Sequence, residues 1–187
     1  MKYTSEVFQR LSRGQFISSN SIDAETRAIY SDIEENQQEY EDYFAKIDFL
    51  LSSGDGFYYF SRKEAKVITE NKLQSLFSWI DYLDFLKTYD TAFDAGTQFS
   101  LVQMEVKLAT IPGLKEKLAQ MFPDKTTNHQ KLETLAGAME SMGFAELVNE
   151  ADSTYQVTNA FHYIEQIILC INIDEDVKDE IPWKEWG

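Results

Sequence analysis

One pattern occurs twice along this chain: an amphipathic helix is followed by a short apolar strand, a polar turn, a second strand and another helix. The strands cover residues 47–51 and 57–61 in the first copy, and 144–148 and 154–158 in the second. Moving the first copy forward by 97 positions places Tyr58 on Tyr155. A helix followed by a hairpin is the order of a winged helix, so the sequence predicts two winged helices in tandem.

The fold class that follows is mostly α with small β-hairpins (α+β), with the two winged-helix domains joined by a long helix. We expect a first domain over residues 1–61, a connecting helix and joint over 62–98, and a second domain over 99–173. We expect residues 174–187 to form an acidic tail on which Trp183 and Trp186 are exposed. Disorder of this tail and docking on a partner both remain open.

Local signals fix several ends of these elements. The turn at 54–56, with two glycines around Asp55, is the strongest hairpin signal. Strand alternation then predicts that Leu50, Phe60, Leu147 and Val157 face the core. Other signals are C-caps at Gly14 and Gly143, an N-cap at Asp23, and capping boxes at Ser61/Glu64, Ser100/Gln103 and Thr127/Gln130.

Charge and composition restrict the partners. The chain has 32 acidic and 17 basic residues, a formal charge of −15, which repels phosphate backbones and anionic membranes and favours protein partners. No apolar run approaches the ~20 residues of a membrane helix, and the start lacks a secretion signal, so we expect a cytoplasmic protein that uses no membrane. The single cysteine, Cys170, excludes a disulfide framework and is expected to be a buried thiol.

Enzymatic chemistry finds little support. Asp94, Glu105 and Lys107 have the spacing of a metal-dependent nuclease, but the last two lie on a predicted helix and point to different faces. His129 and Glu133 are one helical turn apart and lack a third ligand. His162 has no nearby nucleophile for a triad, and a glycine-rich phosphate loop is absent from the sequence. We therefore expect neither an active site nor a cofactor.

Direct reading of DNA is also disfavoured. In a DNA-binding winged helix the third helix carries basic or amide side chains to base edges. Here the charged side chains of the two corresponding helices, 37–46 and 128–142, are mostly acidic. The basic residues gather elsewhere, where they are either solvated flanking charges or weak contacts to the DNA backbone: Arg10, Arg13, Arg62, Lys63 and Lys66.

The sequence resembles a known family in the run 8–17, in Ile29-Tyr30 with 34–36, in Tyr43-Phe44 and in the strand 56–60. These segments are similar to the MukE/MksE subunits of bacterial condensins, the kite proteins (kleisin-interacting tandem winged-helix elements), which include the corresponding Wadjet subunit. The resemblance implies a non-enzymatic homodimer that binds a MukF/MksF-like kleisin and, through it, an SMC ATPase. Such a protein would be nucleoid-associated and would support chromosome segregation and DNA condensation, or plasmid defence.

Two sets of residues are candidates for these contacts. A kleisin segment could pair with the two hairpins, which we call the first and the second wing. The candidate residues are Tyr58, Phe60, Tyr155 and Val157, although ordinary packing within the hairpins explains the two tyrosines as well. Self-association could use the first lobe together with the apolar face of the long helix. Alternatively, that face could pack between the lobes. Its apolar residues are Leu73, Phe77, Trp79, Ile80 and Phe85. A winged-helix transcription regulator and an adaptor for an unrelated partner are the other interpretations, and the condensin class is open.

Overall fold

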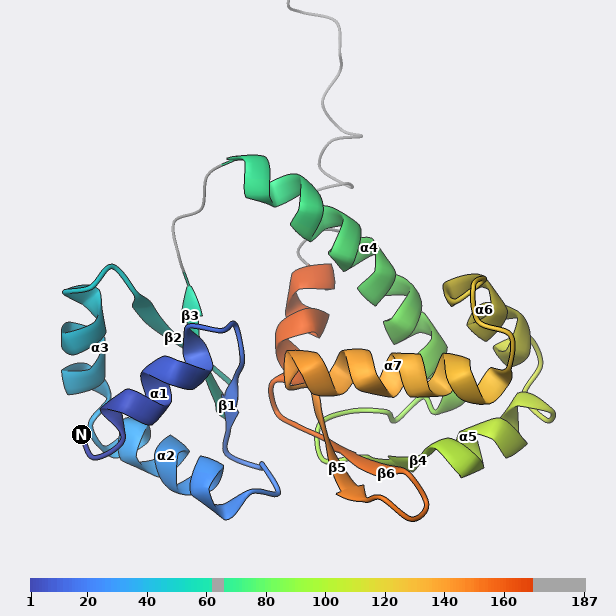
Figure 1. The fold of residues 1–187 in the computed structure, drawn as a ribbon, viewed down its shortest axis with the longest axis horizontal. Helices are drawn as coiled ribbons and strands as arrows, with labels where there is room; N and C mark the ends of the chain where they lie inside the picture. Colours follow the sequence, from blue (N-terminus) through green and yellow to red (C-terminus); the bar gives the residue numbers. More distant parts are fainter. Residues whose placement is uncertain (62–65, 170–187) are drawn as a thin grey trace, which may run out of the picture.

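The chain folds into two lobes that lie side by side (Figure 1). The computed structural model describes the backbone of residues 1–61 and 66–169, and the side chains of 1–61 and 77–169. The predicted capping residue Glu64, the thiol of Cys170 and the acidic tail lie outside the described residues.

Each lobe is built from helices and one three-stranded antiparallel sheet. The first lobe contains α1 (Thr4–Leu11), β1 (Ile17–Ser18), α2 (Ala24–Glu35), α3 (Gln37–Ala45), β2 (Leu50–Gly54) and β3 (Phe57–Ser61). After α4 (Lys66–Tyr89), the second contains β4 (Gln98–Ser100), α5 (Leu101–Leu108), α6 (Leu114–Met121), α7 (Asn128–Met142), β5 (Ala145–Asn149) and β6 (Thr154–Val157). A further helix covers residues 161–169. The predicted α+β class is confirmed.

The two sheets share one topology. Their strand orders are β1-β3-β2 and β4-β6-β5, so the second hairpin strand is central in each. Tyr58 lies opposite Ile17 in the first sheet, and Tyr155 lies opposite Phe99 in the second. The repeat therefore places the two tyrosines at equivalent positions, each facing the small first strand of its lobe.

Several predicted helix ends are present. The Asp23 side chain accepts hydrogen bonds from the backbone N–H groups of Glu25 and Thr26, and Thr127 and Gln130 form the expected capping box. Gly143 ends α7 in the left-handed conformation that favours glycine. The Ser100 box is wrong, because the Ser100 hydroxyl donates to the Asp152 carbonyl instead, at 2.9 Å, and so ties α5 to the second wing.

The predicted register of the first hairpin is wrong by one residue. Leu51 pairs with Phe60 and belongs to the core, whereas Leu50 pairs with Ser61 and is 48% exposed. Residues 47–49 precede the strand, and Asp48 turns the chain with a φ of 62°. A one-residue slip moves each side chain to the opposite face, which is why Leu50 points away from the core. Val157 is buried as predicted, and Phe60 and Leu147 are partly buried.

The two hairpins have loops of different length, which explains why the alignment of the two copies predicts the wrong face for Leu50. The first hairpin closes through Asp55 and Gly56 alone. The second has a longer loop and a register irregularity between Leu147 and Asn149, so Leu147 pairs with Tyr155. The positions equivalent to Leu147 and Tyr155 by sequence, Leu50 and Tyr58, are therefore not partners in the first sheet.

Each lobe has its own buried core, and β3 contributes to both. Tyr58 lies in the first core with Ile17, Ile29 and Phe44. Its two neighbours on β3, Phe57 and Tyr59, point to the opposite side of the strand. Phe57 lies in the core of the second lobe, and Tyr59 packs against that core. Because neighbouring side chains of a strand face opposite sides, this one strand is covered on both faces.

The long helix α4 belongs to the second lobe over its last part. Trp79, Phe85, Leu86 and Tyr89 are buried in the second core, and α4 packs against α6. The order α4, β4, α5, α7, β5, β6 then repeats the order of the first lobe, with α6 as an addition. Thus α4 both follows the first wing and serves as the first helix of the second lobe.

Candidate functional site: the cleft between the lobes

A polar contact holds the two lobes together around Asn20. Its side-chain amide donates to the Val157 carbonyl at 3.2 Å, and its carboxamide oxygen accepts from the Asn159 backbone N–H at 2.8 Å. The Asn20 backbone carbonyl accepts from the Gln156 side chain at 3.1 Å. The Asn159 side chain in turn donates to the Ser19 hydroxyl at 2.9 Å. One first-lobe loop is therefore bonded to the end of the second wing.

Glu146 of β5 extends this contact. One of its carboxylate oxygens accepts from the Ser21 hydroxyl at 2.7 Å, and the other accepts from the Ile22 backbone N–H at 2.6 Å. Hydrogen bonds to a carboxylate are stronger than those between neutral groups. Glu146 is thus a fixed link between β5 and the loop that precedes α2.

Aromatic rings fill the adjoining space. Phe16 lies in contact with four rings, two from the first wing and two from the second lobe: Phe57, Tyr59, Phe144 and Tyr163, with centroids 5.1 to 5.8 Å apart. Such tilted and edge-on contacts add to the stability gained from burial. The mutual position of the lobes is therefore set by both apolar and polar contacts.

A cleft of about 480 Å³ opens beside these contacts. It lies between the first-lobe segment from Arg10 to Thr26 and the second-lobe segment from Glu140 to Leu147. Phe16, Ile22 and Leu147 give it apolar walls, and Asp23, Glu140 and Glu146 give it carboxylates. The lining is thus suited to a ligand with both apolar and basic groups.

The basic residue of this lining, Arg10, is already paired. Its guanidinium donates to the Thr26 hydroxyl and lies 3.8 Å from a carboxylate oxygen of Asp23 and 3.5 Å from one of Glu25. The pKa of Asp23 is lowered chiefly by the Thr26 hydroxyl and backbone N–H, with a smaller effect of Arg10. Arg10 therefore stabilises the start of α2 and is little available to DNA phosphates.

The other candidate DNA contacts fall into two groups. Arg13 is exposed just after α1. Arg62 and Lys63 lie outside the described residues, and Lys66 begins α4 but its side chain is outside them too. A weak backbone contact by these residues stays a prediction.

The candidate wing residues lie mostly inside the protein. Tyr58 and Val157 are buried, Phe60 packs against the first core, and Tyr155 stacks on Phe99. Their side chains are therefore little available to a partner. A partner could instead bind the backbone of the wings, because β2 and β5 are the edge strands of their sheets. β5 also supplies residues to the lining of the cleft.

The candidate dimer contacts on α4 differ in how far they are exposed. Trp79 and Phe85 are buried in the chain's own second core, and Ile80 packs against it. Phe77 is 56% exposed, and the side chain of Leu73 lies outside the described residues. Self-association through this helix stays a prediction, with Phe77 as the candidate that the fold leaves accessible.

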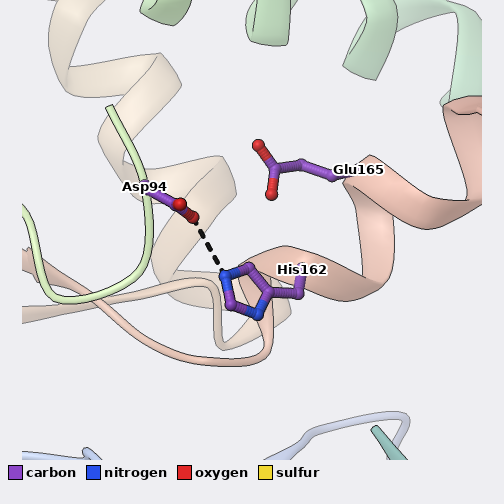
Figure 2. A group of neighbouring side chains, drawn as sticks. All are labelled: Asp94, His162 and Glu165. Atoms are coloured by element: carbon purple, nitrogen blue, oxygen red, sulfur yellow. Dashed lines mark hydrogen bonds and ion pairs between the residues drawn. The ribbon is translucent and has the colours of Figure 1, made fainter. Parts of the chain in front are cut away.

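One group of side chains has the composition of a metal site. Asp94, His162 and Glu165 present ligand atoms within 4.8 Å of one another (Figure 2). His162 already bonds Asp94 at 3.0 Å, and the Lys87 ammonium lies 2.9 Å from a Glu165 oxygen and donates to the Phe93 carbonyl at 2.5 Å. A cation would have to displace that ammonium. We infer that these contacts hold the loop after α4 against the helix at 161–169.

The other titratable residues that the sequence suggested as metal ligands or catalytic groups do not form one site. Glu105 lies 3.8 Å from Nδ1 of His129, and Glu133 lies 3.4 Å from Nε2. The two carboxylates approach opposite nitrogens of one ring, which does not make a shared metal site. Lys107 lies over the Tyr89 ring, 4.2 Å from its centroid. Asp94, Glu105 and Lys107 therefore each contact a different group.

Similarity to a known protein family extends over most of the chain. A family model described as condensin complex protein MksE matches residues 2–168. The chain belongs to the MksE family. A search of curated proteins gave no match. The match includes both lobes and the residues that line the cleft. Within its described part, this MksE-family chain has no helix long and apolar enough to cross a membrane.

Proposed function

We propose that this MksE-family chain is a non-enzymatic kite subunit that binds a MukF/MksF-like kleisin and so joins an SMC ATPase. The complex would be of the MksBEF/MukBEF-like or the Wadjet-like kind, acting at the nucleoid in the cytoplasm. The supporting observation is the acidic, partly apolar cleft beside the edge of β5 in a chain of the condensin family. We propose that the kleisin segment binds in this cleft.

The chemistry of the cleft suggests how such a segment would bind. β5 hydrogen-bonds to β6 on one side, and none of its residues makes a loop or cap backbone hydrogen bond to another described segment. An extended segment can add to such an edge through its main chain, while its side chains enter neighbouring pockets. Basic side chains would face Glu140, and apolar ones would contact Leu147 and Ile22.

The same fold explains why protein binding is proposed in preference to DNA reading. In the position of a recognition helix, α3 carries Glu39, Glu41 and Asp42, and α7 carries Glu133 and Glu140. Lys131 of α7 is buried. We therefore expect the isolated protein to bind duplex DNA weakly and to lose that binding at modest salt. Sequence-specific binding at physiological salt would instead support a transcription regulator.

The decisive experiment is binding to a MukF/MksF-like kleisin from the same organism. We expect a complex at micromolar concentration by calorimetry. Replacing Leu147 and Ile22 by Glu should weaken it at least about tenfold, because each introduces an unpaired charge into the apolar wall. Val102→Glu on α5 is the control, since Val102 is 53% exposed and is not part of the cleft. No complex with the unaltered protein would contradict the proposed function.

A further inference from the structure

A second surface of the first lobe has the properties of a protein-binding site. Three large apolar side chains lie at the junction of α3 and β2, and we call Tyr43, Ile47 and Leu50 the α3–β2 patch. Their exposed fractions are 45%, 47% and 48%. They fall within eight residues of one another: Tyr43 lies in α3, Ile47 in the connection after it and Leu50 at the start of β2. Figure 1 shows α3 on the outer side of the first lobe, away from the second lobe. Neighbouring apolar side chains exposed to this extent mark an interaction site more often than isolated ones do.

The patch is held in place by the core beneath it. Phe44 and Leu51, each the chain neighbour of a patch residue, are buried in the first core. The Tyr43 ring meets the Phe44 ring edge-on, with centroids 5.3 Å apart. Below Ile47, the Phe49 backbone N–H donates to the Phe44 carbonyl at 3.1 Å. A partner would therefore meet a surface that is already ordered, which lowers the entropy cost of binding.

The patch adjoins an open strand edge. β2 is the outer strand of its sheet and pairs with β3 on one side. None of its residues makes a loop or cap backbone hydrogen bond to another described segment. Proteins usually protect such edges with charged residues or proline. The sequence of β2, LLSSG, has neither.

Charge decides which partner suits this surface. The exposed residues around the patch include Glu39, Asp42 and Asp48, opposed by Lys46. A second copy of this chain would bring the same carboxylates together, and like charges oppose such pairing. A segment with lysine or arginine beside its apolar residues would be attracted instead.

We infer that the α3–β2 patch is a second protein-binding surface, which takes an extended segment of alternating apolar and basic residues and adds it to the edge of β2. This inference goes beyond the proposed kleisin site, because the cleft lies between the lobes and shares no lining residue with the patch. A chain with both surfaces can hold two protein segments at once. The attraction between the basic side chains of the bound segment and the carboxylates around the patch should appear mainly in the rate of association.

The experiment uses the full-length protein and two labelled eight-residue peptides, one of alternating Lys and Val and one of alternating Glu and Val. We expect the Lys peptide to bind at least about tenfold more tightly. Ile47→Ser with Leu50→Ser should remove most of this binding, and Asp42→Asn with Asp48→Asn should weaken it and reduce its salt dependence. The matched control is Val102→Ser with Val106→Ser, a pair of exposed residues on α5. Circular dichroism verifies folding.

Three results would overturn the inference. One is equal binding of the two peptides, and another is an equal loss of binding in the control pair. The third is a dimer that dissociates in the Ile47→Ser, Leu50→Ser variant by light scattering, which would make the patch a self-association surface. Kleisin binding is measured in the same variants. It should be unchanged by the patch substitutions, so a failure of this inference is distinguishable from a failure of the proposed function.

Discussion

Gly56 shows most directly how a single residue serves both lobes. It ends the turn of the first wing with a φ of 77°, and its carbonyl accepts from the Ser19 backbone N–H at 2.9 Å. A Cβ at this position would collide with the side chains of Asn159 and Ser19. Only glycine satisfies both the left-handed backbone and the close approach of the second lobe.

Gly56→Ala should therefore destabilise the protein more than an alanine at another left-handed glycine. Gly14 is the matched control, because its φ is 78° and a Cβ there would meet nothing within 4 Å. Gly14→Ala should cost about 1 kcal/mol from backbone strain alone. Gly56→Ala should cost that amount and also displace Asn159 from Ser19. Urea unfolding measures both, and equal costs would contradict the close inter-lobe contact.

Carboxylates with lowered pKa make stability depend on pH at the acid end. Although partial burial raises it, the pKa of Asp94 is held below 3.8 by the Ala95 backbone N–H, by His162 and by Lys87. The pKa of Asp23 is lowered chiefly by Thr26. A carboxylate that is more acidic in the folded state contributes stability above its unfolded pKa, and this contribution is lost as pH falls through the folded value.

We expect the free energy of unfolding to fall as the pH drops below about 4, the ordinary pKa range of these groups. Asp94→Asn should lower stability at pH 7 and make this acid loss less steep, because one linked proton is removed. Thermal unfolding between pH 3 and pH 7 tests it. Asp81→Asn, on an exposed part of α4, is the control. A steeper acid loss in Asp94→Asn than in the unaltered protein would contradict the assignment.

At the scale of the element, most local signals in the sequence predict the structure, with the Ser100 box as an exception, and long-range contacts are not predicted. The N-cap at Asp23 and the box at Thr127 depend on neighbours within three residues, and both are present. The Leu50 register depends on the left-handed turn at Asp48 and on the loop length, which apolar alternation does not encode. The contacts of Asn20 and Glu146 join segments more than a hundred residues apart, and no periodicity predicts them.

The helix α4 is the element whose role changed most. The sequence predicts self-association or packing between the lobes for its apolar face, and in the structure Trp79 and Phe85 lie in the second core, to which Phe57 of the first lobe also belongs. The Trp79 ring meets the Phe144 ring edge-on at 5.0 Å. Helical periodicity shows that a face is apolar, but it does not identify the surface that covers it.

Substitutions two positions apart on α4 should therefore differ sharply. Trp79→Ala should cost roughly 3–5 kcal/mol, the range for large buried aromatic residues. Phe77→Ala should stay within about 0.5 kcal/mol, as is usual at exposed sites. Denaturant unfolding gives both values, and light scattering of Phe77→Ala tests whether self-association uses this side chain. A small cost for Trp79→Ala would contradict its place in the second core.

At the scale of the whole molecule, the two lobes form a single arrangement with one proposed binding site between them. The cleft has one wall from each lobe, so its width depends on the contacts of Asn20, Glu146 and Phe16. A cleft formed in this way binds a segment only while the lobes keep their mutual position. Inter-lobe contacts should thus influence partner binding without touching the partner.

Asn20→Ala tests this dependence. The substitution removes both side-chain hydrogen bonds of Asn20 to the second lobe, and each net contribution is about 1 kcal/mol. We expect a broader distribution of distances between spin labels placed at Gln38 on α3 and Lys115 on α6, two exposed positions in different lobes, after replacement of Cys170. Kleisin affinity should fall in parallel, because only part of the population then has a correctly formed cleft. Asn36→Ala is the matched control, since the Asn36 side-chain amide donates to the Asp32 carbonyl at 2.8 Å, inside the first lobe and away from the cleft. A broadened distribution with unchanged kleisin affinity would mean that the kleisin binds outside the cleft. An unchanged distribution would mean that the remaining contacts, those of Glu146, Asn159 and Phe16, hold the lobes in place without the Asn20 side chain.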